Sequence, residues 1–520
     1  MLRYNPQRVQ DAMLEQTDAL RRSPATHWRW VALLTLIIAG GCFLRFWRLG
    51  AQSLWFDEGY SAWMATNLPR QIVYLIRFDV SPPLYYLLLH LWRESFGDSE
   101  FALRSMSAVA GCLALPLMAL TARRMTGSWF ASLVATVVFS LSVLQVQYAQ
   151  EARSYGLASM LALVAFYAMV RRTNGLWWWM VLAGFAVAVS VWLHNMMWFY
   201  VVGLALAYLI APGRTRLRQR VIDLAWMNGL VVAAFIPWIP ALRGQMQWLS
   251  GNFWASIPTG WDLTQVLLAV GGIKVMHLAA IGPAALAWIA AAVLAVIALL
   301  ASIGGRPGYA RWTLALLVYA TIPILAVFTY AHFQQSFFLE KVFTASTLAI
   351  PLLAALAATG RGRVISIAAL VVLLAGSCLS LWGYFQWEQK EDWRSAVAYV
   401  NGFPRDDTLV IFVANEGELL YDYYRRQSEQ FGHNTTGAPQ GFLDLNPPRT
   451  IQRVLRPQDT GRLQQQLEQN QPQRIILVLS HTHFSDPDML TRQLIESRAT
   501  QISEKHFHWI DVLEFRVHQR

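Results

Sequence analysis

Two adjacent carboxylates, Asp57 and Glu58, lie in the aromatic segment Leu54-Trp55-Phe56-Asp57-Glu58-Gly59-Tyr60. One carboxylate of such a pair can take a proton or orient a nucleophile while the other holds a cation or supports the scaffold. The structural alternative is an acidic cap on a following helix over Tyr60–Ala65. Residue types and spacing weigh these two interpretations about evenly.

A third carboxylate, Asp79, precedes the rigid pair Pro82-Pro83, which is followed by Tyr85 and Tyr86. We interpret Asp79 as a catalytic candidate and Tyr85 as a substrate-contacting one. The alternative for Asp79 is a simple turn, because Asp, Ser and Pro are all frequent in turns.

Two arginines add a second kind of chemistry, because a guanidinium binds phosphate through two parallel hydrogen bonds and keeps its charge. Arg104 follows Glu100, and Arg153 follows Glu151 in Glu151-Ala152-Arg153-Ser154-Tyr155. Each arginine could instead form a local ion pair or extend to the membrane interface. Several arginines on the same face as the carboxylates would favour an anionic ligand.

Weaker candidates for ligand binding are expected on the same face as the carboxylates. His194 is interpreted as substrate-binding, although an isolated interfacial histidine is more often packed than reactive. Lys341 is a candidate phosphate ligand, although it could pair with the adjacent Glu340. Lys274 and His277 lie in an outer amphipathic segment.

The tail of the chain carries two His-x-His pairs, His481/His483 and His506/His508. Both histidines of a pair would face one way on a strand, but the sequence supplies no fixed partner ligand, so no metal site is predicted. The cysteines Cys42, Cys112 and Cys378 all lie in apolar segments and predict no disulfide framework.

These residues must be positioned by membrane helices. Apolar and aromatic residues make up 55% of the 520-residue chain, charged residues only 14%, and the mean hydropathy is +0.35. Soluble domains carry roughly 25% charged residues, so an ordinary soluble enzyme is excluded. Runs of about 20 apolar residues match the thickness of a bilayer. We expect eleven spans, near residues 31–49, 102–122, 129–147, 153–170, 176–193, 195–211, 221–241, 279–302, 311–330, 342–360 and 364–384.

The charges of the loops predict the orientation. With residues 1–30 placed in the cytoplasm, the inner side holds 17 basic and 4 acidic residues, and the outer side of the membrane part holds 10 and 9. That asymmetry is the positive-inside pattern, so the net charge of +11 indicates cytoplasmic loop anchors and not nucleic-acid binding. We expect the short apolar stretch Pro82–Trp92, within the outer loop 50–101, to lie at the outer membrane interface. The same is expected of the later segment Gln245–His277.

Residues 385–520 differ in composition and are expected outside the membrane as a small α/β domain. Helices are predicted over Glu391–Val400, Gly417–Arg426 and Pro487–Ser497. Strands are predicted over Thr408–Ala414, Ile475–Ser480 and His508–Val517. Pro- and Gln-rich stretches at Pro439–Pro457 and Gln464–Gln473 are expected to be loops or a low-complexity helix.

The motifs resemble those of GT-C membrane glycosyltransferases. They are the acidic pair after Trp55-Phe56, the Asp79 to Tyr86 segment, Glu100 with Arg104-Ser105-Met106-Ser107-Ala108, Glu151 to Gly156, and Pro237-Trp238-Ile239-Pro240. More narrowly, the chain resembles bacterial relatives of protein O-mannosyltransferases and of the lipid A aminoarabinose transferase. The likeness covers roughly residues 28–350, and Glu391-Asp392-Trp393-Arg394 also looks like bacterial members.

The resemblance implies an α-helical polytopic membrane protein in the bacterial inner membrane, with a transmembrane GT-C-like catalytic domain over 31–384 and a periplasmic domain over 385–520. It implies a polyprenyl-phosphate sugar as donor, Asp57 acting on the acceptor hydroxyl, and Arg104 near the donor phosphate. The chain departs from the lipid A transferase pattern at Val80 and Ser81, where an acidic residue and Lys are expected. It also has Glu340-Lys341 where many relatives show Arg-Tyr.

The resulting hypothesis is an inverting glycosyltransferase that moves a sugar to a lipid, glycan or protein outside the cytoplasm. Arg104, Arg153 and Lys341 would hold the phosphate, Asp57 would act as base, and Glu58 would support it. No cofactor is identified, and a divalent cation stays an open alternative. The competing classes are a transporter or flippase, which calls for polar residues at mid-membrane and often inverted repeats, and a ligase for lipid-linked glycans.

Overall fold

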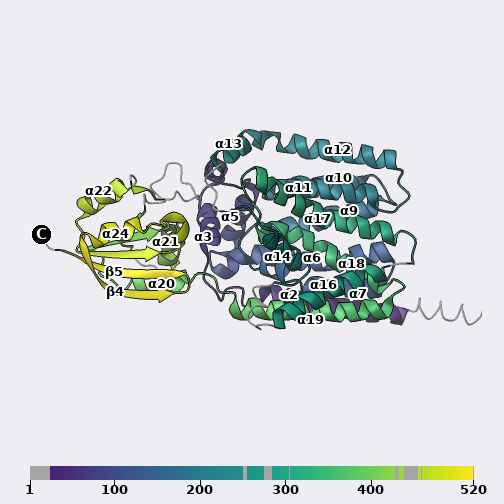
Figure 1. Ribbon diagram of the computed structural model, residues 1–520. Helices are drawn as coiled ribbons and strands as arrows, with labels where there is room; N and C mark the ends of the chain where they lie inside the picture. Colours follow the sequence, from purple (N-terminus) through teal and green to yellow (C-terminus); the bar gives the residue numbers. More distant parts are fainter. Residues whose placement is uncertain are drawn as a thin grey trace, which may run out of the picture.

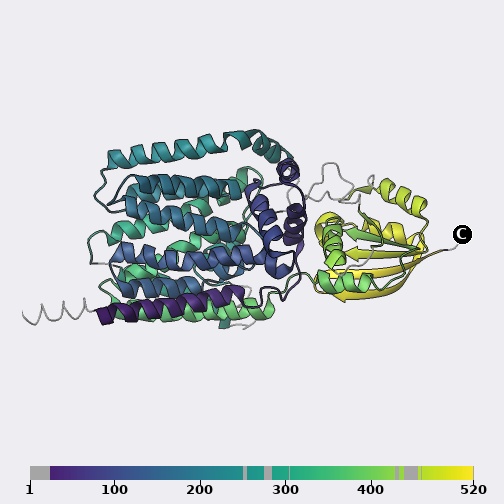
Figure 2. The ribbon, with the colours of Figure 1, turned by 180° about the vertical axis from the view of Figure 1, so that it is seen from behind.

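The computed structural model describes residues 24–249, 255–274, 284–303, 305–427, 432–438, 455–457 and 460–518. A helical bundle formed by the described residues between Pro24 and Trp387 is followed by a smaller sheet domain at one end of the bundle (Figure 1). The same end carries the short helices α3 and α5, which lie between the bundle and the sheet domain (Figure 2). This arrangement places the loop that contains Asp57 at the junction.

Each of the eleven predicted apolar segments contains a helix in the structure. Six helices are long and apolar enough to cross a bilayer by length and composition, and shorter apolar helices lie among them, so the protein is a multi-pass membrane protein. The bundle helices are α2 (Pro24–Phe46), α6 (Glu100–Thr126), α7 (Trp129–Ser140), α8 (Val143–Gln147), α9 (Tyr155–Arg172), α10 (Trp178–Leu193), α11 (Met197–Ile210), α12 (Leu217–Phe235), α16 (Ala284–Ser302), α17 (Tyr309–Phe333), η3 (Glu340–Leu348), α18 (Ala349–Ala358) and α19 (Arg363–Trp387).

The first outer loop folds into short helices: α3 (Phe56–Thr66), α4 (Pro69–Leu75), the 3₁₀ turn η1 (Ile76–Phe78) and α5 (Leu84–Phe96). The predicted short apolar segment is helix α5, which begins directly after Pro83 because proline suits the start of a helix. Helix α5 packs against α3 and α6, so the loop is a compact layer across the end of the bundle.

The predicted amphipathic segment after the seventh span contains two helices. A 3₁₀ turn, η2 (Ile236–Trp238), joins α12 to α13 (Ile239–Leu249), and α14 (Gly260–Val270) follows. Thr259 caps α14 by accepting a hydrogen bond from the backbone of Asp262, whose side chain bonds back to the Thr259 backbone. His277 and the tail residues before Pro24 lie outside the described residues.

The sheet domain contains five strands in the order β2-β1-β3-β5-β4. Strand β1 (Thr408–Val413) pairs in parallel with β2 (Asn434–Gly437) and β3 (Arg474–Leu479), whereas β5 (Ile510–Val517) is antiparallel to β3 and to β4 (Ala499–Phe507). The accompanying helices are α20 (Trp393–Val400), α21 (Gly417–Gln427), α22 (Thr460–Asn470), α23 (Thr482–Ser485) and α24 (Leu490–Glu496). The three predicted helices and three predicted strands are present, but β2, β4 and α23 were not expected.

The sheet domain packs directly on the first outer loop. The Tyr424 hydroxyl accepts a hydrogen bond of 2.6 Å from the Leu54 amide, and Arg394 donates to the Glu100 carboxylate at 2.7 Å. At Gly59 a Cβ atom would lie 2.5 Å from the Leu420 side chain, so α21 approaches α3 at a distance that only glycine accommodates without a shift. The two parts of the chain therefore share one interface around α3.

Candidate active site

Asp57 lies in the first turn of α3, where its carboxylate meets two cations. Its Oδ2 accepts a hydrogen bond of 2.7 Å from Lys341 Nζ and lies 3.9 Å from Arg153 Nε. Burial alone would raise the pKa of Asp57, but the charges of Lys341 and Arg153 outweigh it and lower the pKa to about 2. Asp57 is thus an ionised carboxylate, and its side chain is still 23% exposed.

Lys341 is supplied by η3, which lies 284 residues further along the chain than Asp57. Its ammonium also lies 5.3 Å from the centre of the Trp55 ring and 5.9 Å from that of Tyr155, both within the range of cation–π attraction. From the sequence, the adjacent Glu340 was an alternative ion-pair partner for Lys341. The structure instead pairs Lys341 with the candidate base.

Arg153 lies between α8 and α9 and is 8% exposed. Its Nη1 donates to the Asp57 carbonyl at 3.3 Å, to the Ser61 hydroxyl at 3.4 Å and to the Tyr86 hydroxyl at 3.3 Å. These acceptors are neutral, so Asp57 is its one ion-pair partner among the described residues. With Lys341, Arg153 gives the Asp57 cluster two positive charges for one negative charge.

Glu58 points elsewhere and forms a two-pronged ion pair with Arg104. Arg104 Nε donates to Oε1 at 2.8 Å and Nη2 to Oε2 at 2.7 Å, and the side chains are 0% and 2% exposed. The remaining Arg104 N–H groups donate to the carbonyls of Leu49, Gln52 and Ser53. Every donor position of this guanidinium is occupied by the protein, which differs from the expected role at the donor phosphate.

Two further groups bind Glu58. The Ala152 amide donates to Oε1 at 2.9 Å, and Lys390 Nζ lies 3.1 Å from Oε2. Burial opposes ionisation of Glu58, but Arg104 and Lys390 lower its pKa to about 2. Glu58 therefore joins α3, α6, the segment before α9 and the linker to the sheet domain, and so stabilises the place of Asp57.

Asp79 and Tyr85 both lie near Arg153. Asp79 is 5% exposed and forms a hydrogen bond with the Tyr60 hydroxyl; burial and the charge of Asp79 raise the pKa of Tyr60 well above its usual value. Tyr85 is 2% exposed and packs edge-on against Tyr86, with ring centres 5.4 Å apart. Both residues belong to the packed layer around Arg153.

Glu151 is 4% exposed, and its Oε2 has no hydrogen-bond partner among the described residues. Burial raises the pKa of Glu151 to about 7, although nearby Lys390 acts in the opposite direction. An unsatisfied buried carboxylate oxygen costs free energy, so a hydrogen-bond donor at Oε2 would stabilise the site. His194, which follows α10, lines a small pocket with Tyr155 and Lys341, and burial lowers its pKa to about 3, so the ring is neutral.

A second polar group surrounds Lys274, which is 7% exposed. Its ammonium donates to Gln147 and to Glu388 at 2.8 Å each, and Glu340 Oε2 lies 4.0 Å away. Lys274 therefore links α8, η3 and the end of α19. The outer amphipathic segment thus contacts η3, the element that also carries Lys341.

The sheet domain supplies residues that sequence patterns did not assign to the site. Glu391 accepts a hydrogen bond of 2.5 Å from the Trp393 indole, and its Oε1 lies 3.3 Å from His481 Nε2. The His481 ring is 5.4 Å from that of Phe56, next to Asp57. Burial raises the pKa of Glu391 to about 7 and lowers that of His481. In the part of the chain described, no three potential ligands of the His, Cys, Asp and Glu types converge on a metal site.

Residues 80–240 match the family model described as dolichyl-phosphate-mannose-protein mannosyltransferase. That range includes Arg104, Glu151 and Arg153. An uncharacterised protein of Aquifex aeolicus is 28% identical over 165 residues, which are 30% of this chain and 33% of that protein, so the match spans about a third of the relative.

Solved structures share the fold over most of this chain. ArnT from Cupriavidus metallidurans in the apo state superposes with a TM-score of 0.57 at 14% identity, covering 95% of this chain and 98% of that one. The same ArnT bound to undecaprenyl phosphate gives 0.54 at 14% identity, covering 94% and 98%. The fold is that of the GT-C glycosyltransferases. Arabinofuranosyltransferase AftD from Mycobacteria gives 0.50 at 15% identity, covering 95% of this chain and 42% of AftD. The GT-C resemblance predicted from the motifs is confirmed.

Proposed function

We propose that this protein transfers a sugar from a polyprenyl-phosphate donor to an acceptor hydroxyl on the outer side of a bacterial inner membrane. The observation that supports the proposal best is the Asp57 cluster, in which one ionised carboxylate meets two cations. The GT-C fold and the undecaprenyl phosphate bound to an ArnT of the same fold support a lipid-linked donor.

The orientation follows from the distribution of charge. The Asp57 cluster and the sheet domain lie at one end of the bundle, and α6 starts at that end with Glu100 and ends with Arg123 and Arg124 at the other (Figure 1). Basic loops stay in the cytoplasm, so the site faces outward. Lipid-carried donors suit such a site because nucleotide sugars are cytoplasmic.

Lys341 and Arg153 hold the donor phosphate in this proposal. Each has donors that no described residue accepts from, whereas the N–H groups of Arg104 are all bound. We therefore assign Arg104, with Glu58, to positioning α3. These two cations offset the charge that grows on the phosphate as the glycosidic bond breaks.

Asp57 acts on the acceptor. When a phosphate occupies Lys341 and Arg153, it neutralises the charges that hold the pKa of Asp57 near 2, so the carboxylate becomes a stronger base. Asp57 takes the hydroxyl proton, the acceptor oxygen bonds to the anomeric carbon from the opposite face, and the old C–O bond breaks with its electron pair on the phosphate oxygen. The products are an inverted glycoside and free polyprenyl phosphate. Glu151 Oε2 offers an acceptor for a sugar hydroxyl or amine.

Binding of undecaprenyl phosphate tests the donor site without knowledge of the sugar. We expect the purified full chain to bind it, and Lys341→Met and Arg153→Gln each to weaken binding at least tenfold. Arg48→Gln is a matched control at the same end of the bundle. Undecaprenyl phosphate affinity that is unchanged in both variants would overturn the assignment. Incubation with undecaprenyl-phosphate sugars should then release undecaprenyl phosphate with Asp57 and not with Asp57→Asn.

A further inference from the structure

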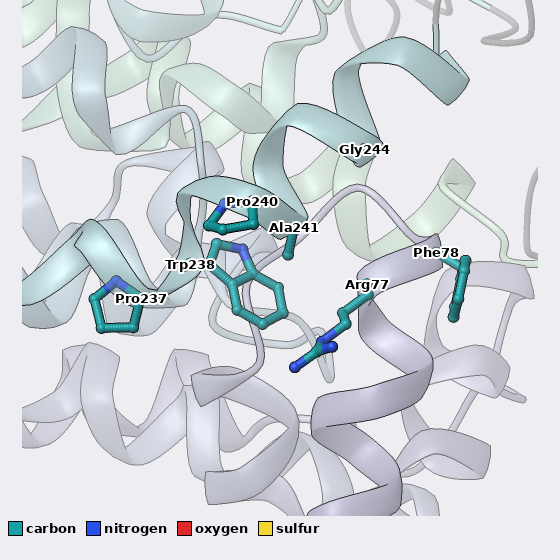
Figure 3. A pocket seen from close by; sticks show the side chains of 7 residues that line it. All are labelled: Arg77, Phe78, Pro237, Trp238, Pro240, Ala241 and Gly244. Atoms are coloured by element: carbon teal, nitrogen blue, oxygen red, sulfur yellow. The ribbon is translucent and has the colours of Figure 1, made fainter.

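A separate cavity of about 620 Å³ lies between η1 and the corner formed by η2 and α13. Its walls include Arg77, Phe78, Trp238 and Gly244, with Pro237 and Pro240 beside the tryptophan. Figure 3 shows the Arg77 guanidinium extending toward the Trp238 ring, below the helix that carries Gly244. The lining shares no residue with the Asp57 cluster.

The polar groups of this cavity lack hydrogen-bond partners among the described residues. Arg77 is exposed, and it has neither a hydrogen bond nor an ion pair to any described residue. The Trp238 side chain is 3% exposed, yet its indole Nε1 is without a hydrogen-bond acceptor in the same part of the chain. The rest of the lining is apolar. A ligand that fits must therefore be amphiphilic and carry negative charge near Arg77.

The cavity lies where lipid headgroups are expected. Helix α12 has 19 residues, about 28 Å at 1.5 Å per residue, which is close to the hydrocarbon thickness of a bilayer. Its apolar side chains Trp226 and Leu230 are 73% and 56% exposed, as is typical of a lipid-facing surface. Ile236, at the start of η2, is also 56% exposed. Pro237, the residue after Ile236, is part of the cavity lining, so the end of this helix adjoins the cavity.

The walls of the cavity are fixed to each other. Gln245 of α13 is 1% exposed, and its Nε2 donates to the carbonyls of Ile76 at 2.8 Å and Ser81 at 3.1 Å. Asn195 donates to the Gln245 side chain at 3.3 Å. These bonds hold α13 against the segment that contains Arg77, so the cavity is formed before a ligand arrives, and binding does not require the walls to be ordered.

We propose that this cavity binds the phosphate head of an anionic membrane lipid, with Arg77 as its ion-pair partner and one lipid chain along α12. The site is a second lipid site, distinct from the donor cations Lys341 and Arg153. It adjoins the catalytic loop, because Asp79, two residues after Arg77, bonds to Tyr60 of α3. An occupied site would stabilise this edge of the loop.

Native mass spectrometry of the full chain in detergent, titrated with phosphatidylglycerol and phosphatidylcholine, tests the proposal. We expect phosphatidylglycerol to bind at least tenfold more tightly, and Arg77→Gln to remove that preference. Arg243→Gln removes an exposed positive charge on the same α13 without touching the cavity lining, and should retain it. Equal binding of the two lipids, or equal losses in both variants, would overturn the proposal.

A second variant fills the cavity without changing charge. A Cβ at Gly244 meets no atom within 4 Å, so Gly244→Leu places a side chain in the cavity without strain. Gly229→Leu on α12, where a Cβ is equally free, is the matched control. Gly244→Leu should reduce phosphatidylglycerol affinity at least tenfold and Gly229→Leu less than twofold. Normal binding by Gly244→Leu contradicts the site.

Two further measurements distinguish this lipid site from a site for free phosphate and from the sugar-transfer site. Glycerol phosphate, which has the head but no chains, should not displace phosphatidylglycerol at equal concentration; displacement would mean that a free phosphate suffices and the lipid assignment is wrong. Asp57→Asn should bind phosphatidylglycerol normally, because the lipid site is separate from the transfer chemistry. Failure of sugar transfer with intact lipid binding would thus count against the proposed function alone.

Discussion

Glu58 and Arg104 join the first outer loop to α6 through two hydrogen bonds of 2.8 and 2.7 Å, with both side chains almost completely buried. Asp57, the neighbouring residue, points instead at Lys341 and Arg153. Adjacent carboxylates in one helical turn therefore have different partners and different tasks. The buried pair fixes the direction of the exposed carboxylate.

Removing one member of this pair should destabilise the protein. Glu58→Gln leaves the Arg104 charge buried with its carbonyl partners, and loss of one partner of a buried pair costs about 3–5 kcal/mol. We expect the melting temperature in detergent to fall clearly. Arg93→Gln removes a partly exposed ion pair with Asp98 and is the control, with a cost below about 1 kcal/mol. Equal melting of the two variants contradicts a structural role for Glu58.

Replacing the candidate base should affect chemistry and not folding. Asp57→Asn keeps the shape of the side chain but cannot accept the proton, so transfer should fall by about 10²–10⁴-fold. The melting temperature should not fall as it does in Glu58→Gln. Glu94→Gln, at an exposed position on α5, is the matched carboxylate control. Near-normal sugar transfer by Asp57→Asn excludes the residue as base.

The acidity of Glu391 predicts a pH effect at the junction between the domains. Burial raises its pKa from 4.5 to about 7, so the folded state favours the protonated form. Its contribution to stability is complete below pH 4.5 and is lost as the pH rises toward 7. Around it lie the Trp393 indole, His481, and the charges of Asp57 and Glu58.

Glu391→Gln imitates the protonated form, which gives a sharp test. The variant and the native chain should have the same melting temperature near pH 4.5. As the pH rises to about 7, the variant should become the more stable of the two. Above that pH the difference in melting temperature should stay constant. His481 has a lowered pKa and contributes the opposite slope, but it is present in both proteins and cancels in the difference. A native chain that is the more stable at pH 8 would refute this account.

The sequence predicted the membrane helices because long apolar runs are a local pattern. The candidate site residues were likewise proposed from short local motifs. It did not predict β2 and β4, which lie at the two edges of the sheet. An edge strand faces solvent, so β4 alternates exposed and partly buried residues and lacks an apolar run. Strand β3, at the centre, is almost completely buried and was recognised.

The pairings within the site were also outside the reach of local patterns. Lys341 meets Asp57 across 284 residues, and Lys390 meets Glu58 across 332. The sequence placed Lys341 beside Glu340, and the family resemblance implied that Arg104 lies near the donor phosphate. Only the contacts that Lys341 of η3 and Arg104 of α6 make with α3 show which cation has all its donors bound by the protein.

The contact between α3 and α21 should behave as a coupled pair. Gly59→Ala introduces a Cβ 2.5 Å from Leu420 Cδ2, so the two helices must separate or the leucine must change its rotamer. Leu420 is 1% exposed, and Leu420→Ala alone leaves a cavity that costs about 2–5 kcal/mol. In the double variant the new methyl group enters the vacated space. The loss of melting temperature should therefore be smaller than the sum of the two single losses, as expected for residues in contact.

Gly402→Ala changes a glycine in the sheet domain away from α3 and is the control. Its loss of melting temperature should add independently to that of Leu420→Ala. If the losses of melting temperature were strictly additive for Gly59→Ala and Leu420→Ala as well, the contact between α3 and α21 would be excluded.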